Sequence, residues 1–178
     1  MRLFCALTAL LLSGLCACSG RLPMARFADD PLSFDPIAFF TGHVASWGVL
    51  EDRSGAPTGR VLTDCVGEAD GPDGLHMMQR LVLEDGSEQH RDWHMRRTGP
   101  RTYEATANDM VGTAVGEASG RVFHWRWVLA TEPGNWLADV TLEQWMYLTD
   151  AGSMINRTVV TKFGVVVAGV TEQFAKQP

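Results

Sequence analysis

The stretch Phe123-His124-Trp125-Arg126-Trp127-Val128-Leu129 decides the fold class. Large apolar side chains occupy every second position of this stretch, and the polar side chains of His124 and Arg126 lie between them. A period of two residues places alternate side chains on opposite faces of an extended strand, and it does not fit a helix. The stretch therefore predicts a β-strand with one apolar face and one polar face.

Similar short apolar or alternating runs continue on both sides of this stretch. Turn sequences separate them, for example Glu84-Asp85-Gly86-Ser87, Thr98-Gly99-Pro100 and Asp150-Ala151-Gly152. The predicted strands cover residues 43–51, 59–68, 75–84, 88–97, 101–108, 110–118, 121–130, 136–148, 153–163 and 165–174. Consecutive strands with short connections favour an antiparallel meander, and closing the meander into a barrel removes exposed strand edges. We therefore predict a mainly β fold, a single meander that closes into a lipocalin-like or calycin-like barrel rather than a sandwich.

The segment before the first strand predicts a short helical turn. In Phe34-Asp35-Pro36-Ile37-Ala38-Phe39-Phe40, Asp35 is suited to cap a helix and Pro36 to occupy its first position. Residues 19–36 carry three prolines and few apolar side chains, which favours an extended tether over a packed element. We expect the turn to close one end of the barrel.

The N-terminus has the layout of a secretory signal, with a basic start at Arg2, an apolar run and then small residues. The apolar run is shorter than the roughly 20 residues that span a bilayer. Leu15-Cys16-Ala17-Cys18 resembles the lipobox of bacterial lipoproteins, in which the last cysteine receives a diacylglyceryl group after cleavage. Two or more acyl chains anchor a protein stably. The alternative is an ordinary signal peptide cut near Ala17, which leaves a soluble periplasmic protein.

These features predict three segments: a signal peptide at residues 1–17, a lipidated tether at residues 18–36 and a β-barrel domain at residues 37–178. Lipidation at Cys18 attaches the chain to a membrane of the bacterial cell envelope. Ser19 follows the cysteine where an aspartate would favour retention in the inner membrane, and by resemblance to enterobacterial sorting this predicts the outer membrane, facing the periplasm.

Cysteine usage and charge exclude some classes of partner and of stabilisation. Cys65 is the one cysteine after Cys18, so the barrel domain has no internal disulfide, and we expect Cys65 to be buried in the core. The net charge of the whole chain is −6, and loss of Arg2 makes it one unit more negative. A negative net charge argues against binding to nucleic acid.

Ordered sequence blocks resemble a family of bacterial lipoproteins, the domain-of-unknown-function family 3833. The blocks are Phe34-Asp35-Pro36, Phe39-Phe40-Thr41-Gly42, Trp47-Gly48-Val49, Asp52-Arg53-Ser54-Gly55, Asn108-Asp109-Met110-Val111-Gly112, His124-Trp125-Arg126, Trp145-Met146-Tyr147-Leu148, Ile155-Asn156-Arg157 and Lys162-Phe163-Gly164. The resemblance covers nearly all of the mature domain. The family has no established activity, so the resemblance implies no catalytic residues for this chain.

Two groups of side chains in these blocks are candidates for a ligand site. The large amphipathic rings, suited to line an apolar cavity, are those of Trp125, Trp127, Trp145 and Tyr147. The polar candidates are His124, Arg126, Glu143, Asn156 and Arg157. An arginine that points inward is suited to bind a carboxylate or phosphate head group with two parallel hydrogen bonds. The alternatives are that the rings only fill the core and that Arg126 and His124 face solvent.

The sequence predicts no cofactor and no metal. His90 and His94 are four residues apart, but in a strand this spacing separates them by roughly 13 Å, which is too far for a shared metal ion. No Gly-x-Ser-x-Gly motif, phosphate-binding glycine loop or zinc-type cysteine and histidine spacing occurs in the chain. We therefore predict that the protein is not an enzyme; the weaker alternative is an enzyme acting on lipids, with His124 or Glu143 as the base.

The sequence favours a membrane-anchored envelope protein that binds or shuttles a hydrophobic small molecule, such as a fatty acyl lipid. The alternative is a structural or assembly lipoprotein that has no ligand cavity and presents a surface to a protein partner, whose identity the sequence does not give.

Overall fold

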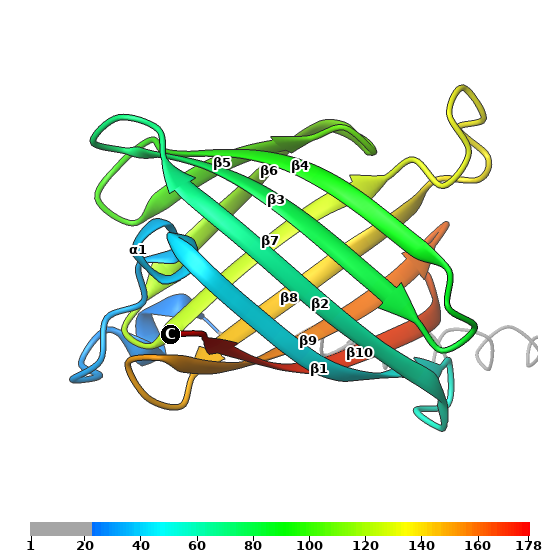
Figure 1. Ribbon diagram of the computed structural model, residues 1–178, viewed down its shortest axis with the longest axis horizontal. Helices are drawn as coiled ribbons and strands as arrows, with labels where there is room; N and C mark the ends of the chain where they lie inside the picture. The colour runs from blue at the N-terminus through cyan, green and yellow to red at the C-terminus, as the bar shows by residue number, and fades with distance from the viewer. Residues whose placement is uncertain (1–22) are drawn as a thin grey trace, which may run out of the picture.

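In residues 23–178, ten antiparallel strands follow one another and close into a barrel, as the sequence predicts (Figure 1). The computed structural model describes residues 23–178. The strands are β1 (Gly42–Asp52), β2 (Pro57–Ala69), β3 (Gly74–Leu83), β4 (Glu88–Arg97), β5 (Thr102–Ala107), β6 (Met110–Ser119), β7 (Val122–Leu129), β8 (Val140–Leu148), β9 (Ser153–Lys162) and β10 (Val165–Lys176). Each strand pairs with the next, and β10 pairs with β1. The predicted meander and its closure are confirmed.

Alternation along each strand separates the inside of the barrel from the outside. In β7, the side chains of Phe123, Trp125 and Trp127 are buried, whereas Arg126 is exposed. A strand that turns one face to the interior and one face to solvent needs this pattern, because its side chains point alternately to the two faces. The apolar face that the sequence predicts for this stretch is the inner face.

Strand β8 begins later than the sequence predicts. The expected strand started at residue 136, but Trp136 and Leu137 belong to a loop before β8, and both are exposed. The loop continues the turn at Gly134 and Asn135, since the Ala138 amide donates to the carbonyl of Asn135. Two apolar residues after a turn imitate the start of a strand, and this explains the error.

A short helix closes one end of the barrel. Helix α1 (Pro36–Phe40) begins with Pro36, and the Asp35 carboxylate accepts hydrogen bonds from the amides of Ile37 and Ala38. This is the capped turn that the sequence predicts. The other oxygen of the Asp35 carboxylate accepts a hydrogen bond from Arg97 of β4 at 2.7 Å, which fixes the start of the helix to the barrel wall.

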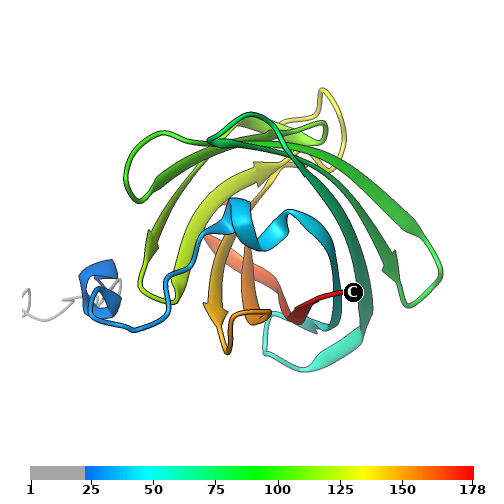
Figure 2. The same cartoon turned by 60° about the vertical axis from the view of Figure 1, so that its left-hand side comes forward.

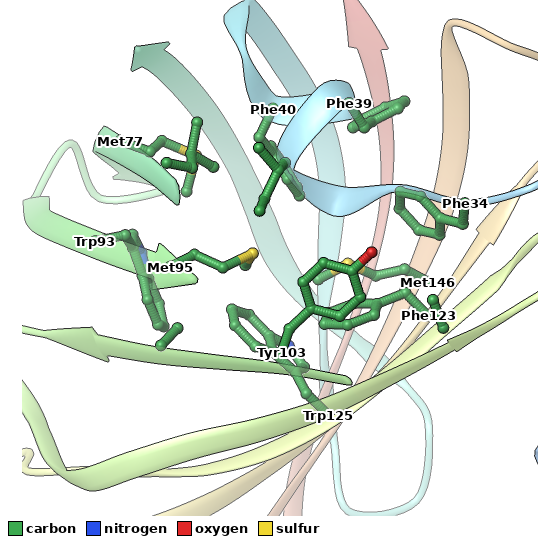
Figure 3. Close-up of a cluster of buried hydrophobic side chains, with 14 of the residues drawn as sticks. Phe34, Phe39, Phe40, Met77, Trp93, Met95, Tyr103, Phe123, Trp125 and Met146 are labelled. Carbon is green, nitrogen blue, oxygen red and sulfur yellow. The ribbon is translucent and has the colours of Figure 1, made fainter. Parts of the chain in front are cut away.

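Helix α1 lies across the opening at its end of the barrel (Figure 2). Its Phe39 and Phe40 rings, together with Phe34, reach a buried cluster that includes Phe123 (Figure 3). A Cβ atom at Gly67 would lie 2.1 Å from the carbonyl oxygen of Phe40, so only glycine at this position lets the helix approach β2 so closely. We call this end, which α1 fills, the closed end.

The chain just before α1 is folded against the closed end and is not simply extended. Met24–Phe27 forms a 3₁₀ helix, and Arg121 donates a hydrogen bond to the Asp30 carboxylate, which lowers the pKa of Asp30. The Phe34 amide also donates to the carbonyl of Gly120. The earlier part of the expected tether and the expected signal peptide lie outside the described residues. Among the described residues, no helix is long and apolar enough to cross a membrane.

Candidate ligand-binding cavity

A cavity of about 370 Å³ lies inside the barrel. Phe40, Met95 and Phe174 bound it toward the closed end. From there it extends past Leu81 and Leu129 toward the opposite end of the barrel, where the turns at 53–56, 84–87 and 163–164 and the loop at 130–139 lie. We call this opposite end the mouth. Leucine, methionine, valine and aromatic side chains form most of the cavity lining, so the interior is suited to an apolar molecule.

Three tryptophans form an aromatic wall of the cavity. Trp93 stacks on Trp125 with a ring separation of 5.2 Å, and Trp127 meets the Trp93 ring edge to face at the same separation. The indole N–H of Trp93 donates to Gln79, and those of Trp125 and Trp127 both donate to Gln144. Because the polar atoms of the wall are satisfied within the wall, the rings offer apolar surface to the cavity.

A buried carboxyl group interrupts this apolar lining. Glu172 Oε1 accepts hydrogen bonds from the hydroxyls of Ser46 and Thr63, both at 2.9 Å, and Oε2 accepts one from the Asn156 amide at 3.3 Å. Burial raises the pKa of Glu172. Gly48 makes room for this side chain, since a Cβ atom there would lie 2.4 Å from Glu172 Cγ.

The Asn156 side chain has hydrogen-bonding capacity left over. Its Oδ1 atom is buried and has no partner among the described residues, whereas its Nδ2 atom bonds to Thr158 and Glu172. Buried polar atoms are nearly always satisfied, so an unsatisfied oxygen in the lining of a cavity calls for an explanation. A donor on a bound molecule or an ordered water is one such explanation.

One arginine points into the cavity. Arg91 of β4 is 6% exposed; its Nε donates to Asp109 at 2.7 Å and its Nη2 to Gln89 at 3.0 Å. Its guanidinium lies 5.5 Å from the centre of the Trp127 ring. Arg91 is close to the start of β4 at the mouth, and a guanidinium has five N–H donors, more than these two hydrogen bonds use. It is therefore placed to receive a polar head at the entrance of the cavity.

The structure brings three of the candidate residues from the sequence into this cavity and places six outside it. Trp125, Trp127 and Asn156 line the cavity. The residues that face outward are His124, Arg126, Glu143, Trp145, Tyr147 and Arg157. Side chains alternate between the two faces of a strand, so the residues next to an inward side chain point outward. The expectation that Arg126 reaches inward to bind a head group is wrong; its solvent-facing alternative is confirmed.

The outward residues form contacts of their own. His124 Nε2 lies 2.9 Å from Glu143 Oε1, and the His124 ring packs on Trp145 with centres 4.1 Å apart. Arg121 lies over the Tyr147 ring at 5.3 Å. These side chains lie on the outer face of the barrel, along β7 and β8, and do not reach the cavity.

Sequence reasoning missed Arg91, Trp93, Gln144 and Glu172. The signal was present in β4, because the alternation that puts Trp93 and Met95 on the inner face puts Arg91 there too. A polar residue within an otherwise apolar face was the sign to look for.

Cys65 lies in the wall of the barrel core, as the sequence predicts. It is free and completely buried, and burial raises the pKa of its thiol to about 12. A thiol with such a pKa stays protonated and unreactive, so Cys65 serves packing.

Comparisons with known proteins support the fold and give no activity. A sequence model of the family "Protein of unknown function (DUF3833)" matches residues 12–176. No curated protein matches the chain. Among solved structures, the S-type phycobiliprotein lyase CPES from Guillardia theta is similar with a TM-score of 0.60 and 6% identity, over 80% of this chain and 90% of that one. Rv2717c from M. tuberculosis is similar with a TM-score of 0.57 and 14% identity, over 82% of this chain and 99% of that one. At these identities the likeness shows a shared calycin-like barrel.

Proposed function

The chain belongs to the DUF3833 family of proteins of unknown function, and we propose that it is a lipid-anchored protein of the bacterial envelope whose barrel holds a hydrophobic small molecule, of the fatty acyl class. The observation that carries this proposal is the internal cavity of about 370 Å³, with its aromatic wall and its arginine near the mouth. Its volume falls within the roughly 300–1,000 Å³ typical of small-molecule sites.

An acyl chain matches the way in which apolar and polar groups are distributed along the cavity. The deep part, at Phe40, Met95 and Phe174, suits the end of a hydrocarbon tail. Arg91 lies nearer the mouth and suits a carboxylate or phosphate head, because a guanidinium binds such groups with paired hydrogen bonds. In this arrangement the head displaces or joins Asp109 at Arg91, and the tail passes the tryptophan wall.

The proposed anchor also implies an orientation. Pro23 lies five residues after Cys18, and such a segment spans at most about 18 Å. Pro23 precedes the 3₁₀ helix that packs at the closed end (Figure 1). An acylated Cys18 would therefore hold the closed end toward the outer membrane, and the mouth would open into the periplasm. This arrangement suits a carrier that exchanges its ligand with a soluble partner.

The alternative of a structural lipoprotein with a filled core has less support, because the interior is not filled.

Binding is tested with a soluble chain of residues 19–178, which keeps every described residue. We expect native mass spectrometry of this chain, purified without detergent from its own bacterium, to show an extra mass that is lost on denaturation. We also expect a fluorescent fatty acid to bind and to be displaced by unlabelled oleate. A chain that carries no ligand and binds no fatty acid would refute the proposal.

Two matched pairs of variants locate the binding. Ala168 lines the cavity, and its neighbour Val167 is exposed, so Ala168→Trp should abolish binding and Val167→Trp should leave it unchanged. Arg91→Leu should weaken binding of a fatty acid at least tenfold and of the corresponding alcohol much less, whereas Arg126→Leu on the outer face should affect neither.

The anchor is tested separately in cells. Cys18→Ala should move the protein from the membrane fraction to the soluble fraction. If the variant stays in the membrane pellet, lipidation at Cys18 is not what holds the protein there.

A further inference from the structure

Three potential metal ligands meet on the outer face of β3 and β4. His76 of β3 lies directly opposite His94 of β4 in the strand register, and Asp92 precedes His94 by two residues on the same strand. Side chains two residues apart in a strand point to the same face, as do those of directly opposite residues. The inward neighbours Met77 and Trp93 are buried in the core, so these three side chains all point outward.

The three side chains are within reach of a single ion. His76 Nε2 lies 2.6 Å and His94 Nε2 3.6 Å from Asp92 Oδ1, and the two imidazole rings stack with centres 4.6 Å apart. One ligand atom from each residue lies within 4.8 Å of the other two. Zinc bonds to imidazole nitrogen and carboxylate oxygen measure about 2.0–2.2 Å, which places tetrahedral ligands roughly 3.4 Å apart. Small side-chain rotations would bring the ligand atoms to this separation. The side chains have room to rotate, because about half of each is exposed.

We propose that His76, Asp92 and His94 form a binding site for a divalent transition metal of the Zn²⁺ type. Two neutral imidazoles and one carboxylate are a ligand set that Zn²⁺ accepts, and they leave one tetrahedral position for water or another molecule. The ion takes the place of the hydrogen bond that now joins His76 to Asp92. The proposal concerns the outer wall and does not depend on the function proposed for the cavity.

The proposed site departs from the expectation that the protein binds no metal. His90 and His94, four residues apart on one strand, are too far from each other for a shared ion. The structure supplies a different partner for His94 from the neighbouring strand, and only the register of β3 with β4 could identify it.

A surface groove adjoins the site and leaves room for a further ligand at the open coordination position. His94 lines a groove of about 460 Å³ together with Asp73 of the β2–β3 connection, Gly74 at the start of β3, and Glu104 and Thr106 of β5. A metal bound by His94 therefore lies at the edge of a space where a small molecule or a side chain of another protein has room to reach it.

Other histidines on the outer wall of the barrel supply matched controls. His43 pairs with Asp64 at 2.6 Å, and His90 lies 3.4 Å from Glu88, but neither belongs to the three-residue cluster. Each is a histidine and carboxylate pair without a third ligand among the described residues. If two ligands were enough, these positions would bind zinc as well as the proposed site does.

The test is a titration of the 19–178 chain with Zn²⁺ in competition with a chromophoric chelator. We expect one ion per chain, and His76→Ala, His94→Ala or Asp92→Asn should each weaken binding at least tenfold. His43→Ala and His90→Ala should bind as the unaltered chain does. Thermal unfolding without metal shows that each variant is folded, and the visible absorption of Co²⁺ reports its coordination independently of affinity.

Two results would overturn the site. One is unchanged zinc binding in His76→Ala and His94→Ala; the other is an equal loss in the control variants, which would indicate adventitious binding to scattered histidines. Separately, a Co²⁺ spectrum of octahedral type in the unaltered chain would contradict the proposed tetrahedral coordination.

Discussion

Replacing Glu172 with glutamine should make the protein more stable at neutral pH. The Glu172 carboxyl is almost completely buried, and the hydroxyls of Ser46 and Thr63 and the Asn156 amide surround it. Glutamine has the same shape as the protonated acid. Its Oε1 keeps both hydroxyl donors, and its Nε2 can donate to the Asn156 oxygen once the Asn156 amide is turned over and the Thr158 hydroxyl donates to the same oxygen.

The size and sign of the effect follow from the proton that Glu172 holds. Burial raises the pKa of Glu172 above its ordinary value of 4.5, so the folded protein keeps this proton at pH values where the unfolded chain has lost it. Between the two pKa values, the free energy of unfolding falls as pH rises, by up to about 1.4 kcal/mol per pH unit. The stabilising contribution is fully present below pH 4.5 and is lost as pH rises through the folded pKa. The glutamine side chain of the variant does not titrate and avoids this loss.

Urea unfolding from about pH 4 to about pH 8 measures the difference directly. We expect Glu172→Gln and the unaltered chain to have similar free energies of unfolding near about pH 4. As pH rises, the unaltered chain should lose stability relative to the variant, so the difference between the two should grow. Glu104→Gln, at an exposed position, should follow the unaltered chain at every pH. Glu172→Leu should lose about 3 kcal/mol or more, because it leaves several buried donors without an acceptor. If Glu172→Gln showed the same pH dependence as the unaltered chain, the buried acid would not be the titrating group.

Three further predictions concern the core and one turn. Cys65 should resist iodoacetamide at about pH 8 while the protein is folded and react once it is unfolded, because its thiol is buried with a pKa of about 12. Mass spectrometry of the labelled chain measures the reaction, and labelling of the folded protein would contradict this prediction. Phe163→Asn should stabilise the β9–β10 turn by about 1 kcal/mol. Phe163 and Gly164 have φ angles of 50° and 81°, and asparagine tolerates a positive φ better than phenylalanine does. A lower melting temperature of the variant in calorimetry would argue against this prediction. Phe123→Ala should cost about 3–5 kcal/mol, because its ring is fully buried among three other aromatic rings; urea unfolding with a loss below about 1 kcal/mol would show that the cluster relaxes.

The sequence predicts the strands well because each strand carries its own signal. The alternation in β7 and the turn sequences at Glu84-Asp85-Gly86-Ser87 and Thr98-Gly99-Pro100 act over a few residues, so they are visible without knowledge of the partners. The same holds for α1, whose start depends only on Asp35 and Pro36. The late start of β8 shows the limit of local signals, because Trp136 and Leu137 are apolar and yet lie in an exposed loop.

The choice between inside and outside could also be made from the sequence, but only by treating each strand as a unit. Once Trp125 and Trp127 are assigned to the inner face, Arg126 and His124 must point outward. The candidate residues came from both faces because they were selected by chemical type within a block. Applied to β4, the same rule places Arg91 beside Trp93 on the inner face.

The polar centre of the cavity could not be predicted, because it depends on how the barrel closes. Glu172 lies in the last strand, and its partner Ser46 lies 126 residues earlier, in the first strand. No local pattern joins them; the pairing of β10 with β1, in which Ser46 lies opposite Phe174, brings them together. A shift of one residue in this pairing would turn the inner face of β10 outward and expose Glu172. The closing register of the barrel therefore decides whether the cavity has a buried acid, and a variant that weakens the β1–β10 pairing should remove the pH dependence of stability together with ligand binding.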